Sequence, residues 1–196
     1  QGNGGYAGNA PEAEATLRTA MRAGAHGFVA ASTDTGHSAQ TEPLGAFAYN
    51  NLQKEIDYGF RAVHLTTVTA KTLIERYYAA HARYSYWDGC STGGRQGLME
   101  AQRFPADFDG IVAGAPVLNF TDTQTAYIWN NQALARTPLT ESKVALVGEA
   151  VYDRCDAADG LEDGLLADPR QCNFDPTVDL PVCGSSRTAD CFTTGE

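Results

Sequence analysis

Basic residues are scarce in this sequence. Its 196 residues include 14 lysines and arginines against 24 aspartates and glutamates, a formal net charge of −10. A field of that sign repels phosphate backbones and anionic lipids, which argues against nucleic acid and membranes as partners. No apolar run approaches the roughly 20 residues that a membrane span needs. The first residues, QGNGGYAGNA, have neither the basic nor the apolar region of a signal peptide, so we expect a soluble chain that begins after any signal.

Closely spaced cysteine pairs are also absent. Four of the five cysteines, Cys155, Cys172, Cys183 and Cys191, lie in the last third of the chain at spacings of 17, 11 and 8. None of them forms the C-x2-4-C pair typical of zinc sites, so zinc is the less favoured alternative. Local disulfides are the preferred interpretation, and they indicate an oxidising compartment. We therefore expect a secreted or periplasmic protein, in which Cys90 has no partner within the chain.

Extended and helical patterns alternate through the first part of the chain. The apolar segments 26–34 and 108–116 and the aromatic segment 83–89 predict strands, of which the two apolar ones are expected to be buried. Segments 59–80 and 93–104 have the residue spacing or composition of helices. This order predicts an α/β fold, a parallel sheet with crossover helices.

The alternation stops after Pro116. A helix is expected over about 140–154, and an acidic loop and a tail rich in Pro, Gly and Cys follow it. We therefore place a domain boundary near residue 118, between domains 1–117 and 118–196.

The segment DGCSTGG, residues 88–94, contains the G-x-S-x-G pattern around Ser91, between a predicted strand and a predicted helix. A serine on such a strained turn can act as a nucleophile, and the amide of Thr92 at the helix start can bind an oxyanion. A glycine-rich connection with an exposed serine is the alternative. A second oxyanion donor could come from Gly4 or Gly5 in GNGGYAG, and a frayed terminus is an equally open interpretation of that segment.

A base for Ser91 is harder to find. In strand-turn-helix hydrolases the order is Ser, then Asp or Glu, then His, and all four histidines of this chain precede Ser91. None is the expected base, and His37 remains as a minority interpretation.

The aspartates Asp156, Asp159 and Asp163 lie at offsets 0, 3 and 7, with glycines among them. This spacing fails the EF-hand pattern. It leaves a solvated acidic turn and a calcium site equally open.

Three segments, ASTDTGH, YGFRAVHLTTVTAK and above all DGCSTGGRQGLMEAQRFPADFDGIVAGAP, resemble the tannase and feruloyl esterase family. The resemblance implies an α/β-hydrolase core with a lid domain inserted after FDGIVAGAP, and hydrolysis of aromatic-acid esters through an acyl-enzyme. It implies that Ser91 is the nucleophile and that Cys90 is bonded to a cysteine beside the catalytic histidine.

The resemblance also implies that the catalytic acid, the histidine and the partner of Cys90 lie downstream of residue 196. The chain is then a fragment, or a second polypeptide supplies the rest, and the chain alone is expected to be inactive. An inactive binding module or calcium-dependent structural domain remains an alternative. Feruloyl, galloyl and terephthalate-type monoesters are all open as substrates.

In the lid, the resemblance implies a structural calcium ion. Its ligands are the side chains of Asp156, Asp159 and Asp163 and the carbonyl oxygens of Leu161 and Leu165. A Cys155–Cys172 disulfide would close this loop, and Cys183–Cys191 is the remaining local pair. The aromatic side chains Tyr127, Trp129 and Tyr152 are candidates for the acyl pocket, although buried aromatics are more often core residues.

Overall fold

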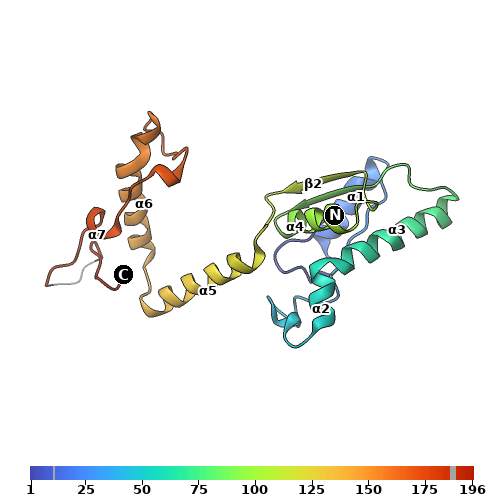
Figure 1. Cartoon of the computed structure of the whole chain (residues 1–196), viewed down its shortest axis with the longest axis horizontal. Helices are drawn as coiled ribbons and strands as arrows, with labels where there is room; N and C mark the ends of the chain where they lie inside the picture. Colours follow the sequence, from blue (N-terminus) through green and yellow to red (C-terminus); the bar gives the residue numbers. More distant parts are fainter. Residues whose placement is uncertain (11, 186–188) are drawn as a thin grey trace. The chain divides into compact units, whose positions relative to one another are not determined.

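The computed structural model describes residues 1–10, 12–185 and 189–196. It divides the chain into two compact units, Gln1–Phe120 and Thr121–Glu196 (Figure 1). The assignment of the second unit to a lid stays a prediction. Among the described residues, no helix combines the length and the apolar character that crossing a membrane requires.

The first unit is built on two parallel strands, β1 (Tyr86–Cys90) and β2 (Gly110–Gly114). They are paired in register from Tyr86 with Gly110 to Cys90 with Gly114. Helix α4 (Thr92–Arg103) connects them and packs on both strands (Figure 1). Trp87 of β1 is buried under α4 and donates its indole N–H to the carbonyl oxygen of Gly93 at 3.0 Å.

The strand predicted over 26–34 is wrong. Helix α1 (Glu14–Ala25) ends just before this segment, and residues 28–34 run without a strand ladder. The neighbouring residues Gln1 and Asn3 supply only separate hydrogen bonds, to the carbonyl oxygens of Ala31 and Thr33. A strand needs repeated backbone pairing, and isolated bonds of this kind do not provide it. The expected burial fails here too, because Phe28 is 53% exposed.

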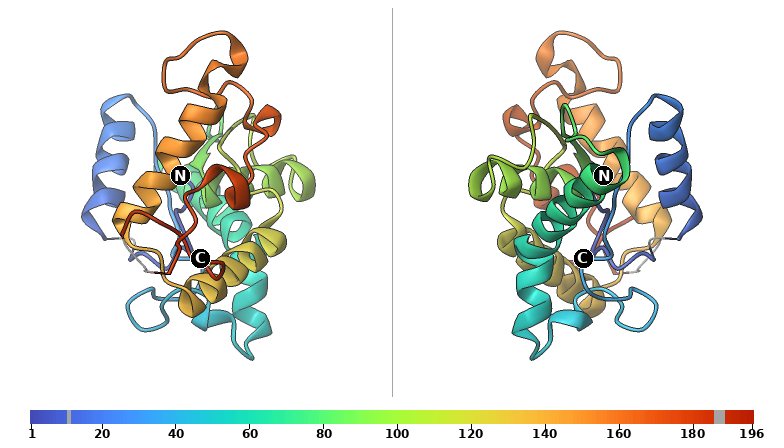
Figure 2. Two further views of the ribbon diagram at one scale, coloured as in Figure 1. Left: turned by 90° about the vertical axis from the view of Figure 1, so that its left-hand side faces the viewer. Right: turned by 90° about the vertical axis from the view of Figure 1, so that its right-hand side faces the viewer.

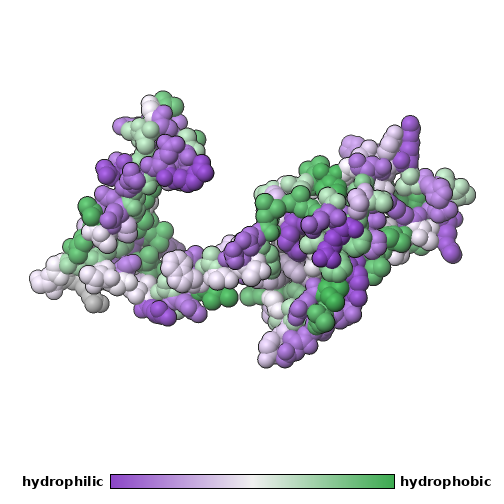
Figure 3. Space-filling view, viewed as in Figure 1, coloured by the Kyte–Doolittle hydropathy of each residue, from purple (hydrophilic) through white to green (hydrophobic). Residues whose placement is uncertain are grey.

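Strand β2 forms where it was predicted, but it is less buried than expected. Its residue Val112 is 63% exposed, and Figure 3 shows apolar surface over this part of the first unit. The expectation of a fully buried strand is therefore wrong for this chain, because β2 pairs with β1 and packs against α4 on one face only.

The long helix of the first unit begins in a short helical series: η1 (Ala46–Ala48), α2 (Leu52–Ile56), the π-helical turn η2 (Asp57–Arg61) and then α3 (Ala62–Tyr78). Val63 at the start of α3 is buried, whereas Leu73 and Tyr77 further along the helix are exposed. The second half of α3 runs out beyond the end of the sheet (Figure 1). A small core of Ala7, Phe47 and Tyr58 lies beside η1 and η2.

The second unit holds most of α5 (Phe120–Arg136), followed by α6 (Glu141–Cys155), η3 (Asp156–Asp159), η4 (Pro169–Gln171) and α7 (Pro176–Asp179). Helix α5 has no counterpart among the predicted elements. Two disulfides, Cys155–Cys172 and Cys183–Cys191, join the local pairs expected from the sequence. Figure 2 shows the loop that follows α6, coloured orange, projecting past the end of that helix.

Candidate active site

Ser91 lies on a sharp turn between β1 and α4. Its backbone has φ 60° and ψ −117°, a region that residues with a Cβ rarely adopt. The turn is held on both sides: the Ser91 amide donates to the carbonyl oxygen of Gly114 at 3.0 Å, and the Ser91 carbonyl accepts from the amide of Arg95 at 3.1 Å. The residue is exposed. A strained, exposed serine at a helix N-terminus is the arrangement in which a hydroxyl can reach a substrate.

The glycines around Ser91 let strand and helix approach closely. A Cβ on Gly89 would lie 2.4 Å from the carbonyl oxygen of Gly93, and one on Gly94 would lie 2.3 Å from that of Gly114. These contacts are with backbone atoms, which cannot move aside as a flexible side chain can. The motif therefore sets the distance between α4 and the sheet at the point where Ser91 turns.

The N-terminal glycine segment is tied to the start of α4. The Thr92 hydroxyl donates to the carbonyl oxygen of Gly5. Asn3 and Gln96 bond each other twice: the Asn3 amide donates to Gln96 Oε1 and Gln96 Nε2 donates to Asn3 Oδ1, both at 3.0 Å. Gly2 donates its amide to the carbonyl oxygen of Asp88 at 2.8 Å. The segment is therefore held in place by specific bonds, and the interpretation as a frayed terminus does not describe it.

Three backbone amides near this turn keep their hydrogen-bonding capacity. Within the described ranges, the N–H groups of Thr92, Gly4 and Gly5 donate to no protein acceptor. Thr92 is the first residue of α4, where the helix dipole favours negative charge. The bond from Thr92 to Gly5 brings the glycine segment to the same turn. The arrangement suits the binding of a developing oxyanion, and that role stays a prediction.

The model of the tannase and feruloyl esterase family matches residues 1–196. The chain belongs to this family. Feruloyl esterase B of Aspergillus niger is 34% identical over 197 residues, which cover 98% of this chain and 36% of that protein. An uncharacterized esterase of Xanthomonas campestris is 36% identical over 170 residues, 85% of this chain and 29% of that protein.

Solved structures of the same kind are similar to this family member. Feruloyl esterase B from Aspergillus oryzae superimposes with a TM-score of 0.72 at 33% identity, covering 88% of this chain and 35% of that one. Tannin acyl hydrolase from Aspergillus niger gives a TM-score of 0.64 at 28% identity, covering 90% of this chain and 33% of that one. The chain thus spans about a third of the length of the relatives that it matches. These neighbours are of the α/β-hydrolase type, in agreement with the predicted fold class.

The histidines of this tannase and feruloyl esterase chain make contacts that do not involve Ser91. His37 is 5% exposed, stacks on Phe47 with ring centroids 3.8 Å apart, and has its Nδ1 3.2 Å from the hydroxyl of Thr35. His64 is bonded to a carboxylate in another part of the unit. Among the described residues no histidine is hydrogen-bonded to Ser91, so the minority interpretation of His37 as the base gains no support. Cys90 is an exposed free thiol, and its pairing with a cysteine outside the chain stays a prediction.

Two polar residues of α4 that hold this site together, Arg95 and Gln96, were not among the predicted site residues. Gln96 is 2% exposed on α4, at a position where a polar side chain needs a partner. The guanidinium of Arg95 lies 4.7 Å from the ring centroid of Tyr58 and 5.4 Å from that of Phe120. The sequence did hold a signal for their role, because both residues are polar and directly follow Gly93 and Gly94, where α4 lies close against the sheet. The identity of their partners, however, depends on segments far away in the chain.

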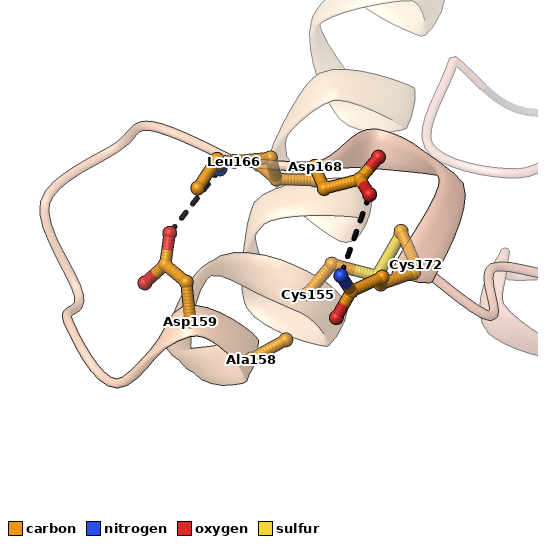
Figure 4. A pocket seen from close by; sticks show the side chains of 8 residues that line it. Cys155, Ala158, Asp159, Leu166, Asp168 and Cys172 are labelled. Carbon is orange, nitrogen blue, oxygen red and sulfur yellow. Dashed lines mark hydrogen bonds between the residues drawn. A yellow bond between two sulfur atoms is a disulfide. The ribbon is translucent and has the colours of Figure 1, made fainter.

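The acidic loop of this family member lies between η3 and η4. Each aspartate side chain accepts hydrogen bonds from backbone amides of the loop. Asp159 accepts from the amides of Leu161 and Ala167. Asp156 accepts from the amide of Gly164, and Asp163 accepts from the amide of Leu165. Figure 4 shows Asp159 and the Cys155–Cys172 disulfide around a hollow. The volume of this hollow is about 60 Å³.

These three aspartates supply the hard oxygen ligands that calcium prefers. Left-handed glycines, Gly160 with φ 100° and Gly164 with φ 78°, turn the loop back on itself between them. The donor chemistry therefore fits a calcium ion. The carboxylates of the loop do not form a ready cluster, however. Among the described residues, the one group of three metal-binding side chains whose ligand atoms lie within 4.8 Å of one another is in the first unit.

Proposed function

We propose that the protein containing this chain is a serine carboxylic-ester hydrolase that acts on esters of aromatic acids. One observation carries the proposal: Ser91 is exposed at φ 60° on the turn between β1 and α4, next to free backbone amides. The family membership and the names of the relatives, feruloyl esterase B and tannin acyl hydrolase, support the substrate class.

In the proposed reaction, the Ser91 hydroxyl gives its proton to the base and attacks the acyl carbon of the ester. The C–O bond to the alcohol then breaks, the alcohol leaves with that proton, and the acyl group stays on Ser91 as an acyl-enzyme. The amides of Thr92 and of Gly4 or Gly5 hold the oxyanion of each tetrahedral intermediate. Water then releases the aromatic acid and restores the serine hydroxyl. Removing one oxyanion donor typically costs about a hundredfold or more in kcat.

The base and the acid of this reaction are proposed to come from residues outside these 196. Two points support this proposal: the side chains of His37 and His64 make their contacts elsewhere, and in hydrolases with this kind of turn the acid and the histidine follow the serine in the chain. The 196-residue chain alone should therefore show no turnover. The partner cysteine of Cys90 is likewise proposed to lie outside these 196 residues.

The test uses the longest form of the protein that contains this chain, with methyl ferulate, methyl gallate and a terephthalate monoester as substrates. Ser91→Ala should abolish hydrolysis of whichever ester is turned over, and a fluorophosphonate probe should label the parent protein but not this variant. Ser85→Ala, just before β1, is the matched control and should retain both activity and labelling. A parent protein that hydrolyses none of the esters and resists the probe would instead be an inactive relative that acts as a binding module.

We also propose that the loop of Asp156, Asp159 and Asp163, with the carbonyl oxygens of Leu161 and Leu165, binds calcium as a structural ion. The donor chemistry and the disulfide at the base of the loop support this assignment. Calcium that binds only the folded state should raise the melting temperature, and chelation should lower it.

Asp159→Asn should reduce the calcium-dependent shift in melting temperature. The matched control Asp153→Asn, at an exposed position on α6, should leave the shift unchanged. An unchanged melting temperature of the parent chain on chelation would refute the calcium proposal without touching the esterase proposal. Secretion or transfer to the periplasm is proposed as well, on the support of the two disulfides.

A further inference from the structure

Three ionisable side chains meet inside the first unit. His64 lies in the first turn of α3, Glu100 near the end of α4, and Asp107 in the connection from α4 to β2. His64 Nδ1 lies 2.6 Å from Asp107 Oδ2. One nitrogen or oxygen atom from each of the three residues lies within 4.8 Å of the other two. The cluster thus joins the start of α3 to the end of α4 and the connection that follows it.

Glu100 is the residue of this cluster that lacks a partner. It is 1% exposed, and neither of its carboxyl oxygens has a hydrogen-bond partner among the described residues. Asp107 beside it is 7% exposed. Burial, and after it the charge of Asp107, raises the pKa of Glu100 to about 8. A buried carboxyl group without a partner is costly, and a second carboxylate nearby increases that cost.

The residues around the cluster pack against it, but they do not offset the negative charge of its two carboxyl groups. Phe104 stacks on the His64 ring, with centroids 3.9 Å apart. Lys71 donates from Nζ to the carbonyl oxygens of Ala106 and Asp107, and so its recorded bonds are with the backbone and not with the carboxylates. Positive charge placed between the two carboxylates would therefore stabilise the folded chain.

We propose that His64, Glu100 and Asp107 bind a divalent transition metal ion, with zinc as the best match. An imidazole nitrogen together with carboxylate oxygens suits Zn²⁺, whereas Ca²⁺ takes oxygen ligands only. Three protein ligands leave one tetrahedral position for water. Zinc–ligand bonds of about 2.0–2.2 Å separate the ligand atoms by about 3.3–3.6 Å. Binding must therefore widen the His64–Asp107 pair from its 2.6 Å.

The ion acts on the structure of the first unit and not on the ester bond. Ser91 precedes the first turn of α4, and Glu100 is nine positions further along, about 13 Å at the rise of an α-helix. A metal at this end would fasten α4 to α3 and to the segment that leads into β2. The inference rests on none of the catalytic assignments, so it can fail while the proposed esterase function holds.

The test uses the longest form of the protein that contains this chain, with Cys90→Ala, because the exposed thiol of Cys90 could bind zinc by itself. Excess calcium is present throughout, to occupy the acidic loop. Calorimetric titration with Zn²⁺ should give one site, and Glu100→Gln should weaken it at least about tenfold. Glu75→Gln is the matched control: it alters the exposed His81–Glu75 pair, and zinc affinity should not change. Circular dichroism melting curves show whether each variant folds.

X-ray absorption at the zinc edge of the Cys90→Ala chain gives a second, mutation-independent measurement. It should report one imidazole and oxygen ligands at about 2.0–2.2 Å. Equal zinc affinity in the folded Glu100→Gln variant, or an absorption spectrum without imidazole, would overturn the assignment and leave a protonated Glu100 as the neutral state of the cluster. If Glu100→Gln does not fold, the absorption spectrum decides alone.

Discussion

Replacing Gly94 by alanine should force α4 away from β2 and destabilise the turn that carries Ser91. The added Cβ would lie 2.3 Å from the carbonyl oxygen of Gly114 and 3.0 Å from Cα of Pro116. Both are backbone atoms, and the first contact is about 1 Å shorter than ordinary van der Waals contact. The same Gly114 oxygen accepts the amide hydrogen of Ser91. A displacement that relieves the clash therefore also disturbs the backbone of the nucleophile.

The expected loss of stability follows from two opposing terms. Alanine is preferred over glycine inside a helix by about 1 kcal/mol. Overpacking against a site that cannot yield costs about 1–3 kcal/mol, and a clash with backbone belongs at the upper end of that range. The net expectation is a loss of about 2 kcal/mol, a large part of the 5–15 kcal/mol that holds a typical domain together.

Urea unfolding followed by tryptophan fluorescence measures this loss. Trp87 is buried in the first unit, and the second tryptophan, Trp129, is removed by Trp129→Phe so that the signal reports on that unit alone. Gly24→Ala in α1 is the matched control, because a Cβ there meets nothing within 4 Å. It should leave stability unchanged or raise it by up to about 1 kcal/mol. If Gly94→Ala proves as stable as Gly24→Ala, the close crossing of α4 over β2 is not as described.

Three further predictions concern the turn, the disulfide and the buried carboxyl group. Ser91→Gly should raise the free energy of unfolding by up to about 1 kcal/mol, because glycine adopts positive φ without strain. The control Ser85→Gly should lower it, because glycine there only adds freedom to the unfolded chain, and urea unfolding compares the two variants. Replacing Cys155 and Cys172 by serine should cost about 3 kcal/mol, since their disulfide spans 17 residues, and a drop of the melting temperature in calorimetry tests this. In metal-free buffer the free energy of unfolding should fall as the pH rises from about 4.5 to about 8, because the raised pKa of Glu100 keeps its proton on the folded chain while the unfolded chain releases it. Urea titrations at several pH values measure this, and a Glu100→Gln variant whose stability falls equally with pH would contradict it.

The sequence by itself determined the features that depend on neighbours in the chain. The turn at Ser91 follows from the glycines around it, because only residues without a Cβ allow strand and helix to approach so closely. The crowding of the cysteines predicted local disulfides, and the resemblance to the tannase and feruloyl esterase family pointed to the two pairs that the structure shows. The helices around 62–78, 92–103 and 141–155 were visible as composition and spacing, although α1 and α5 were not recognised.

Only the tertiary structure decided what these elements meet. The segment 26–34 has the composition of a strand, but pairing needs a second backbone alongside it, and residues 1–3 supply only isolated bonds. Asn3 and Gln96 are 93 positions apart, and their mutual bonds turn a glycine-rich end into a fixed part of the site. His64, Glu100 and Asp107 likewise meet only when α3 packs on α4. Long-range contacts of this kind depend on how helices pack against a sheet, which no local pattern of residues encodes.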